Sequence, residues 1–253
     1  MREITNLIIC GCNGKMGREI VSCASERENC RVVSGIDIKT ELPSEFPVVS
    51  KPMEISVEAD VMIDFSNPSL LPSLLQYAQI NKTPLVLCTT GYNASQVEML
   101  TRVSKEIPVF YSGNMSIGIN LLIELAKTAA KVLGNSFDIE IIEKHHNQKI
   151  DAPSGTALMI ADGISSVLNK NVNYMYDRHS QRKKRETSEI GIHSIRGGTI
   201  VGEHEVLFAG QHEVITLSHS AQSRRILAVG ALNAALFLTK QKPGLYNMSD
   251  MLK

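Results

Sequence analysis

The stretch Leu7-Ile8-Ile9-Cys10-Gly11-Cys12-Asn13-Gly14-Lys15-Met16-Gly17-Arg18 decides the first part of the fold. Its opening apolar run predicts a short strand of a parallel sheet that is covered on both faces. The glycines that follow allow a tight turn into a helix whose N-terminus can hold a pyrophosphate. The spacing is G-x-x-G-x-x-G rather than the more common G-x-G-x-x-G, so a plain glycine-rich turn is the competing interpretation.

A charged pair follows the next predicted strand, which covers residues 31–36. Asp37 ends that strand 20 residues beyond Gly17, where a carboxylate can accept hydrogen bonds from an adenosine ribose. Lys39 lies two positions later and could meet a 2′-phosphate, although a solvated loop charge is the competing interpretation. The pair predicts the use of both NADH and NADPH.

The alternation of strands and helices continues over the next hundred residues, with strands predicted at 61–65, 84–88 and 108–111. In open parallel sheets, ligands bind at the carboxyl ends of the strands. Two polar segments follow such ends and are candidate loops beside a nicotinamide, unless they are simple turns. They are Cys88-Thr89-Thr90-Gly91 and Ser112-Gly113-Asn114-Met115.

A dense polar segment follows the β-branched run Ile139-Glu140-Ile141-Ile142, which predicts a strand. His145, His146 and Lys149 lie in this segment, which ends ahead of an apolar helix predicted over 156–168. A helix start exposes unpaired backbone N–H groups and the positive end of a dipole, and therefore binds carboxylates well. Two imidazoles and an ammonium group beside it predict an acid/base and anion site. A charged surface loop is the competing interpretation.

The rest of the second half is predicted to be mainly β-structure. A basic, polar stretch over 177–189 is expected to be a solvated loop rather than a nucleic-acid patch, because it has no interleaved aromatic residues. The segments 190–196, 199–209 and 213–220 are β-rich and separated by glycine turns, so they predict an antiparallel meander. A last helix is predicted over 224–240, with small residues on one face.

Composition excludes several classes of function. Lysine plus arginine equals aspartate plus glutamate, at 26 each, so no net field favours nucleic acid or a membrane surface. The five cysteines form neither a disulfide nor a metal framework, which predicts reduced thiols that pack in a cytoplasmic protein without a metal. A dinucleotide fold followed by a unit with a histidine and lysine anion site implies hydride transfer to a small anionic substrate.

At this point the sequence resembles the 4-hydroxy-tetrahydrodipicolinate reductases, also called dihydrodipicolinate reductases, of the lysine and diaminopimelate pathway. The resemblance extends over nearly the whole chain, and its most specific part is the segment 143–157, which matches the pattern E-x-H-H-x-x-K-x-D-A-P-S-G-T-A. Supporting matches are the segments 11–17, 88–91, 191–198, 201–204, 223–224 and 244–248.

The resemblance implies reduction of 4-hydroxy-tetrahydrodipicolinate to tetrahydrodipicolinate with NADH or NADPH, in a homotetramer. It implies that His145 is the acid/base group, that Lys149 donates a proton to the enamine intermediate, and that carboxylates are bound by His146 and the backbone N–H groups of Gly155 and Thr156. The pyrophosphate would lie on Gly11, Cys12, Asn13, Gly14, Lys15 and Met16, with Asp37 on the ribose and Lys39 nearby. The nicotinamide would be flanked by Cys88, Thr89, Thr90, Ser112, Gly113, Asn114 and Met115.

The resulting fold class is α/β, with a Rossmann-like dinucleotide-binding domain over 1–115 and 226–253. An α+β domain over 116–225, with a mostly antiparallel sheet, would bind the small dicarboxylate substrate and form the tetramer. Gly113 and Met115 depart from the usual residues of the family, and no arginine directly follows Asp37, so cofactor preference stays open. The alternatives are an aspartate-type dehydrogenase and a non-catalytic dinucleotide sensor.

Overall fold

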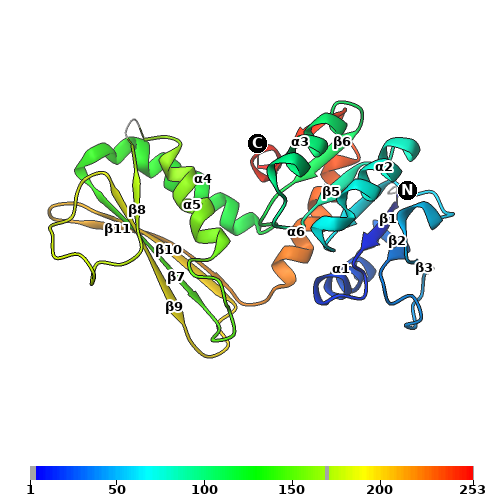
Figure 1. Ribbon diagram of the computed structural model, residues 1–253, viewed down its shortest axis with the longest axis horizontal. Coiled ribbons are helices and arrows are strands. Elements are labelled where there is room, and N and C mark those ends of the chain that lie inside the picture. The colour runs from blue at the N-terminus through cyan, green and yellow to red at the C-terminus, as the bar shows by residue number, and fades with distance from the viewer. Residues whose placement is uncertain (1–3, 169–170, 253) are drawn as a thin grey trace. The chain divides into compact units, whose positions relative to one another are not determined.

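The computed structural model describes residues 4–168 and 171–252. It contains two compact units, and the first is discontinuous in sequence. Unit 1 consists of Met1–Ser116 and Arg225–Lys253, and unit 2 of Ile117–Arg224. In Figure 1 the first unit therefore carries both the blue and the red ends of the colour scale, while the second is green to orange.

Unit 1 is built on a seven-stranded parallel sheet with the strand order β12-β6-β5-β4-β1-β2-β3. The chain runs outward from β1 to β3 and then returns to the other side of β1 as β4, so the order reverses between β1 and β4. Ligands bind at the carboxyl ends of strands at such a reversal. The strands are β1 Thr5–Cys10, β2 Cys30–Ile36, β3 Val48–Val49, β4 Val61–Asp64, β5 Leu85–Leu87, β6 Pro108–Tyr111 and β12 Gly244–Tyr246.

Helices cover both faces of this sheet (Figure 1). Leu7 and Ile9 of β1 pack into the core under α1 Lys15–Ser25 and α6 Arg225–Leu238. Ile8 and Cys10 point the other way, into the core under α2 Leu71–Asn81 and α3 Ala94–Val103. Successive strand residues face opposite sides, which is why a doubly covered strand is apolar throughout. Short helical segments are η1 Pro52–Glu54, η2 Pro68–Leu70 and α7 Met248–Met251.

Local signals in unit 1 are confirmed where they depend on neighbouring residues. The Asn93 side chain accepts from the N–H of Gln96 at 2.9 Å, and the Gln96 side chain accepts in return from the Asn93 N–H at 3.0 Å. These two hydrogen bonds form a capping box, and it begins α3. All five cysteines are buried and free. Burial raises the pKa of Cys12 to about 11, so its thiol stays protonated and packs.

Unit 2 contains a five-stranded sheet with the order β11-β10-β7-β9-β8. Two of its pairings are antiparallel and two are parallel, so the sheet is mixed rather than mostly antiparallel. The predicted antiparallel meander paired the segments 190–196 and 199–209, which are β9 and β10, and this pairing is wrong. Strand β7 lies between β9 and β10 and runs parallel to β9. The strands are β7 Asp138–His145, β8 Asn173–Met175, β9 Glu189–Arg196, β10 Gly202–Ala209 and β11 Val214–Ala221.

One face of this sheet is covered by two helices, α4 Ile117–Leu133 and α5 Gly155–Ser165 (Figure 1). Ile139 and Ile141 of β7 join their core, together with Val206 and Phe208 of β10. The core-facing residues of β7 are therefore its odd-numbered ones, and this parity continues to Glu143 and His145. The turn η3 Gly134–Ser136 links α4 to β7.

The basic loop over 177–189 is less solvated than expected. The Arg185 side chain is 17% exposed and donates to Glu140 and to the Asp138 carboxylate. Arg178 pairs with Glu189 at 2.9 Å, and that carboxylate is itself buried. Two arginines of this loop therefore fasten it to the sheet through carboxylates. Among the described residues, no helix is long and apolar enough to span a membrane.

Candidate active site

The segment between β7 and α5 brings the predicted histidines and lysine of unit 2 to the start of a helix. His145 is the last residue of β7, and α5 begins ten residues later at Gly155. Ser154 is the N-cap of α5, and its hydroxyl accepts from the N–H of Ala157 at 3.2 Å. Gly155 is exposed, and a Cβ placed on it would meet no atom within 4 Å. The helix start is thus open at Gly155.

Glu143 is the carboxylate at the centre of this segment, and it is fully buried. It accepts two hydrogen bonds from Arg196 of β9, at 2.7 and 2.8 Å. It also accepts from the backbone N–H of Ser154 at 3.1 Å. Burial acts to raise the pKa of Glu143, but hydrogen bonds from Arg196, Ser194 and His145 outweigh it and lower this pKa to about 2.

His145 is held by this carboxylate. Its Nδ1 lies 2.5 Å from Oε2 of Glu143, and its side chain is 11% exposed. Burial lowers the pKa of His145, and the hydrogen bond with the Glu143 carboxylate works in the opposite direction. The imidazole is therefore neutral more readily than an exposed histidine.

His146 points to a different partner, Arg224, at the end of unit 2. Its Nε2 lies 3.1 Å from Nη2 of Arg224. A guanidinium group only donates, so Nε2 is the acceptor and the hydrogen of a neutral His146 is on Nδ1. That Nδ1 is buried and has no hydrogen-bond partner among the described residues.

Lys149 lies in the loop between His146 and α5. Its backbone N–H donates to the carbonyl of His146 at 3.1 Å, which turns the chain back. Its Nζ lies 2.9 Å from Oδ1 of Asp151, and the hydrogen bond from Lys149 lowers the pKa of Asp151. Because the Asp151 side chain is 60% exposed, this ion pair is weak and the ammonium group can exchange it for another anion.

His204 of β10 packs against the ring of His145. The two rings meet edge to face, with centroids 5.3 Å apart. His204 Nε2 lies 3.2 Å from the Ser154 hydroxyl oxygen. Burial, followed by the charge on His145, lowers the pKa of His204 to about 3, so this ring is neutral at ordinary pH.

In unit 1, the glycine-rich turn has the close packing that the motif requires. Gly11 adopts a φ of +75°, and a Cβ there would lie 2.8 Å from the carbonyl oxygen of Phe65. A Cβ on Gly17 would overlap the carbonyl oxygen of Gly11. Gly14 is the N-cap of α1 and makes no side-chain cap bond, so the cap leaves the helix start clear for an anion.

Asp37 fastens the glycine-rich turn to the end of β2. Its carboxylate oxygens accept from the backbone N–H of Asn13 at 2.9 Å and of Lys39 at 3.0 Å. The Asn13 side chain in turn donates to the Lys39 carbonyl at 2.7 Å. Each carboxylate oxygen keeps a second lone pair for a hydroxyl group. These three residues line a cavity of about 410 Å³ that also reaches Ser66 and Leu70.

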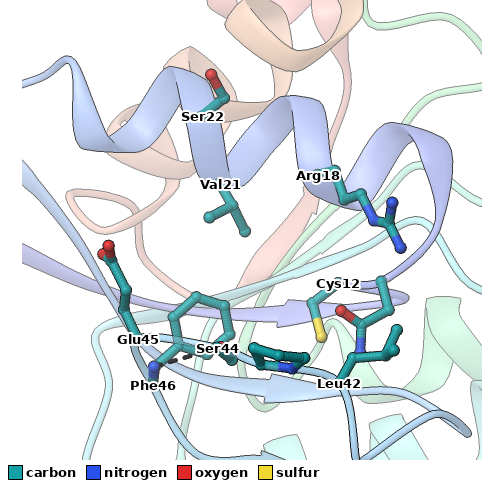
Figure 2. Close-up of a pocket in the computed structure, with 10 residues that line it drawn as sticks. Cys12, Arg18, Val21, Ser22, Leu42, Ser44, Glu45 and Phe46 are labelled. Atoms are coloured by element: carbon teal, nitrogen blue, oxygen red, sulfur yellow. Dashed lines mark hydrogen bonds between the residues drawn. The ribbon is translucent and has the colours of Figure 1, made fainter.

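A second cavity, of about 430 Å³, also has Asn13 in its lining, and Figure 2 shows it. It is lined by the first turns of α1 and by the loop that carries Leu42 and Phe46. Figure 2 shows the Arg18 guanidinium beside Cys12 at one end of this cavity and Glu45 at the other. Asn13 thus lines both cavities beside the glycine-rich turn.

The two predicted nicotinamide-side segments follow β5 and β6, at the carboxyl edge of the sheet. Cys88 and Thr89 are buried and Thr90 is exposed. The Ser112 hydroxyl donates to the Asn114 carbonyl at 2.8 Å and fixes the turn that includes Gly113. Met115 is 1% exposed and belongs to the core under α6, so its side chain packs inward.

Four polar residues received no role in the sequence interpretation. Glu143, Arg196 and Arg224 lie in segments that match the family pattern, and Asp64 does not. Glu143 is one of the odd-numbered residues of β7 that face the core, so an acid stands where the alternation calls for an apolar residue. That acid was the signal in the sequence that could have indicated its role. Arg196 and Arg224 come from other elements of unit 2, so nothing local indicated their contacts. Asp64 ends β4, is fully buried and accepts from Tyr92 at 3.2 Å; burial raises its pKa.

Among the described residues no group of histidine, cysteine and carboxylate side chains could hold a metal ion. The fold and the two sites define an oxidoreductase that joins a dinucleotide-binding type of sheet to a unit with an imidazole and ammonium anion site. The chain belongs to the dihydrodipicolinate reductase family: the description of the family's N-terminus matches residues 5–115, and that of its C-terminus matches residues 118–252.

Relatives named 4-hydroxy-tetrahydrodipicolinate reductase match over almost their whole length. The protein of Caldanaerobacter subterraneus subsp. tengcongensis is 56% identical over 247 residues, which is 98% of each chain. That of Clostridium tetani is 49% identical and covers 98% of this chain and 97% of its own. A dihydrodipicolinate reductase structure from Paenisporosarcina sp. TG-14 with bound dipicolinate has a TM-score of 0.81 and 27% identity, covering 96% of this chain and 97% of its own.

Proposed function

We propose that the chain reduces 4-hydroxy-tetrahydrodipicolinate to tetrahydrodipicolinate with NADH or NADPH as the reductant. Its family membership makes it an oxidoreductase of lysine biosynthesis, a 4-hydroxy-tetrahydrodipicolinate reductase. The observation that best supports this substrate and this reaction is the cluster of side chains at the start of α5. There His145, the His146–Arg224 pair and Lys149 come from one short stretch and the end of unit 2.

The substrate carries two carboxylates, and the cluster offers donors for both. The Nδ1–H of His146 is buried and unpartnered among the described residues, and Arg224 beside it adds a cation. Gly155 opens the helix start, where backbone N–H groups of Gly155 and Thr156 attract an anion through the helix dipole. A dipicolinate is bound to the Paenisporosarcina relative, which supports a ring dicarboxylate as the ligand here.

The proton chemistry falls to Lys149 and His145. A reduced nicotinamide supplies the hydride after the substrate has lost water. Lys149 Nζ then donates the proton that the enamine carbon takes up, since its ion pair with Asp151 is exposed and can open. His145 is the acid/base group of the site, and its Nδ1 is held by the Glu143 carboxylate.

The residues of unit 1 fit a dinucleotide. Gly11 and Gly17 provide a cradle that a Cβ would fill, and the Gly14 cap leaves the start of α1 clear for a pyrophosphate near Lys15 and Met16. Asp37 has lone pairs left for ribose hydroxyls in the cavity of about 410 Å³. The exposed side chain of Lys39 lines the same cavity and could meet a 2′-phosphate, so we propose that both cofactors are used.

On the carboxyl edge of the same sheet, the nicotinamide would lie against the segments after β5 and β6. Cys88, Thr89 and Thr90 form the first, and Ser112, Gly113 and Asn114 the second. Met115 contributes its backbone only, because its side chain is in the core.

A homotetramer is part of the proposal, and the second face of the unit 2 sheet supports it. Helices α4 and α5 pack on the other face. The second face carries partly exposed apolar side chains, Ile142, Leu207 and Val214, and the ion pairs of Lys144 with Glu203 and Glu205. Analytical ultracentrifugation should give a tetramer that Leu207→Glu dissociates. Val132→Glu, at an exposed position of α4, should leave the tetramer intact. A wild-type monomer would refute it.

The test of the reaction is the loss of NADH or NADPH absorbance with freshly generated 4-hydroxy-tetrahydrodipicolinate. We expect turnover with both cofactors and none with the substrates of an aspartate-type dehydrogenase. That alternative would not need Lys149 at the start of α5, and a non-catalytic sensor would not need the open helix start. No oxidation of either cofactor would remove the proposed function.

A further inference from the structure

We propose that Glu143, held by Arg196, is the positioning residue that fixes the ring of His145 and the start of α5 together. The proposal rests on the proposed function for the role of His145 as acid/base group. The hydrogen-bond network itself can be tested without substrate, through the tautomer of His145.

The network is complete around the carboxylate of Glu143. Oε1 accepts from Ser154 N at 3.1 Å and from Arg196 Nη2 at 2.7 Å. Oε2 accepts from Arg196 Nη1 at 2.8 Å and lies 2.5 Å from His145 Nδ1. Arg196 Nη2 also donates to the Asp151 carbonyl at 2.6 Å. One side chain therefore connects the end of β7, the end of β9 and the cap of α5.

This arrangement selects one tautomer of His145. The Glu143 carboxylate is ionised at neutral pH, since its pKa is about 2, and an ionised carboxylate can only accept. The nitrogen that faces it, Nδ1, must therefore carry a hydrogen. The proton-exchanging nitrogen is then Nε2, with a lone pair in the neutral ring and a hydrogen in the charged ring.

Gly202 of β10 keeps Nε2 uncovered on one side. A Cβ on Gly202 would lie 3.1 Å from Nε2 of His145, so a larger side chain would press on that atom. The lack of a side chain at this position is consistent with Nε2 as the working nitrogen.

The charges around His145 oppose one another. Glu143 favours the charged ring, while burial, Lys149 and Arg196 disfavour it. His204 of β10 packs against the ring and is neutral, with a pKa of about 3. Glu143 is the carboxylate in contact with the ring, so replacing it by an amide should lower the pKa of His145 further.

Glu143→Gln is the informative variant, because the amide keeps an oxygen for Ser154 N or Arg196 but can present an N–H₂ group to His145. The hydrogen of His145 should then move from Nδ1 to Nε2. Imidazole ¹⁵N chemical shifts in histidine-labelled protein report this directly, over a pH titration and without substrate. We expect an Nδ1–H tautomer in the wild type and an Nε2–H tautomer with a lower pKa in Glu143→Gln. In the reaction, kcat should fall about 10- to 100-fold with KM little changed.

Glu140→Gln is the matched control. Glu140 lies on the same strand and also contacts a histidine, His193 at 2.8 Å, and an arginine, Arg185 at 3.0 Å. Its loss should affect stability but neither the tautomer nor the pKa of His145. This comparison separates a positioning role from the general cost of losing a strand carboxylate that pairs with a histidine and an arginine.

An Nε2–H tautomer in the wild type would overturn the proposal, even if the variant failed to fold. A changed tautomer in Glu143→Gln with unchanged kcat would overturn its catalytic part. A wild type with the expected tautomer but without turnover would instead refute the proposed function and leave the network as described.

Discussion

Lys149 is the residue on which the proposed chemistry depends most directly. Lys149→Ala should lower kcat by about two to four orders of magnitude, the usual scale for losing a general acid. Lys144→Ala is the matched control, because Lys144 pairs with Glu203 and Glu205 on the other face of the sheet. Steady-state kinetics with either cofactor measure both variants. Full activity in Lys149→Ala would exclude Lys149 as the proton donor.

His204 makes the stability of the protein depend on pH. Its pKa is about 3 in the folded protein and about 6.5 in an unfolded chain. Below about pH 6.5 the unfolded chain therefore takes up a proton that the folded chain refuses, and stability falls as the pH falls towards 3. Glu143, with a folded pKa of about 2, contributes a loss only below about pH 4.3.

His204→Gln should therefore flatten the pH dependence of stability. The difference in the free energy of unfolding between pH 7 and pH 5 should shrink by about 2 kcal/mol, at about 1.4 kcal/mol per pH unit. Urea denaturation at the two pH values measures it, with the exposed His212→Gln as the control. Equal pH dependence in wild type and His204→Gln would contradict the assignment.

At the scale of elements, the glycine-rich turn has no room for a side chain at Gly17. Gly17→Ala would place a methyl group on the carbonyl oxygen of Gly11, so α1 has to move away from β1. Affinity for NADH, followed by its fluorescence, should fall at least about tenfold, which corresponds to about 1.4 kcal/mol. Gly197→Ala is the control, because no atom lies within 4 Å of a Cβ at that site. Unchanged affinity in Gly17→Ala would argue against this binding site.

Elements that follow from neighbouring residues were predictable, and their pairing was not. The capping box of Asn93 and Gln96 and the apolar run of β1 are local patterns, and both are present. The segment 190–196 has the composition of a strand whether it pairs with β10 or with β7. Its partner is set by contacts far away in the sequence, and so the parallel pairing with β7 was missed.

The candidate site divides in the same way into local patterns and distant contacts. The order of His145, His146 and Lys149 before a helix start is visible in the sequence, and the structure brings them to that place. The support of His145 depends on Arg196, which is 53 residues away from Glu143. No periodicity or motif spacing reports a contact of that kind, whereas the acid on the apolar face of β7 could have raised the question.

At the scale of the whole molecule, the C-terminal segment completes the core of unit 1. Ala228, Ala231 and Leu232 of α6 are fully buried in the same core as Leu7 and Ile9 of β1. Unit 1 therefore contains both ends of the chain, with unit 2 inserted between them.

Leu232→Ala should reduce the free energy of unfolding by about 2–5 kcal/mol, because a large side chain leaves a cavity in a close-packed core. Leu245→Ala is the control: Leu245 is 43% exposed, and we expect a loss of under about 1 kcal/mol. Thermal or urea denaturation measures both. Similar losses for the two leucines would mean that α6 contributes little to the core.

The insertion of unit 2 also constrains synthesis of the protein on the ribosome. Residues 1–116 emerge first, yet the core on one face of their sheet waits for α6, which is made after all of 117–224. At about 5–20 residues per second this wait lasts roughly 5–20 s. During that time the nascent sheet exposes the apolar face that α6 later covers. A chaperone would bind this face in that interval.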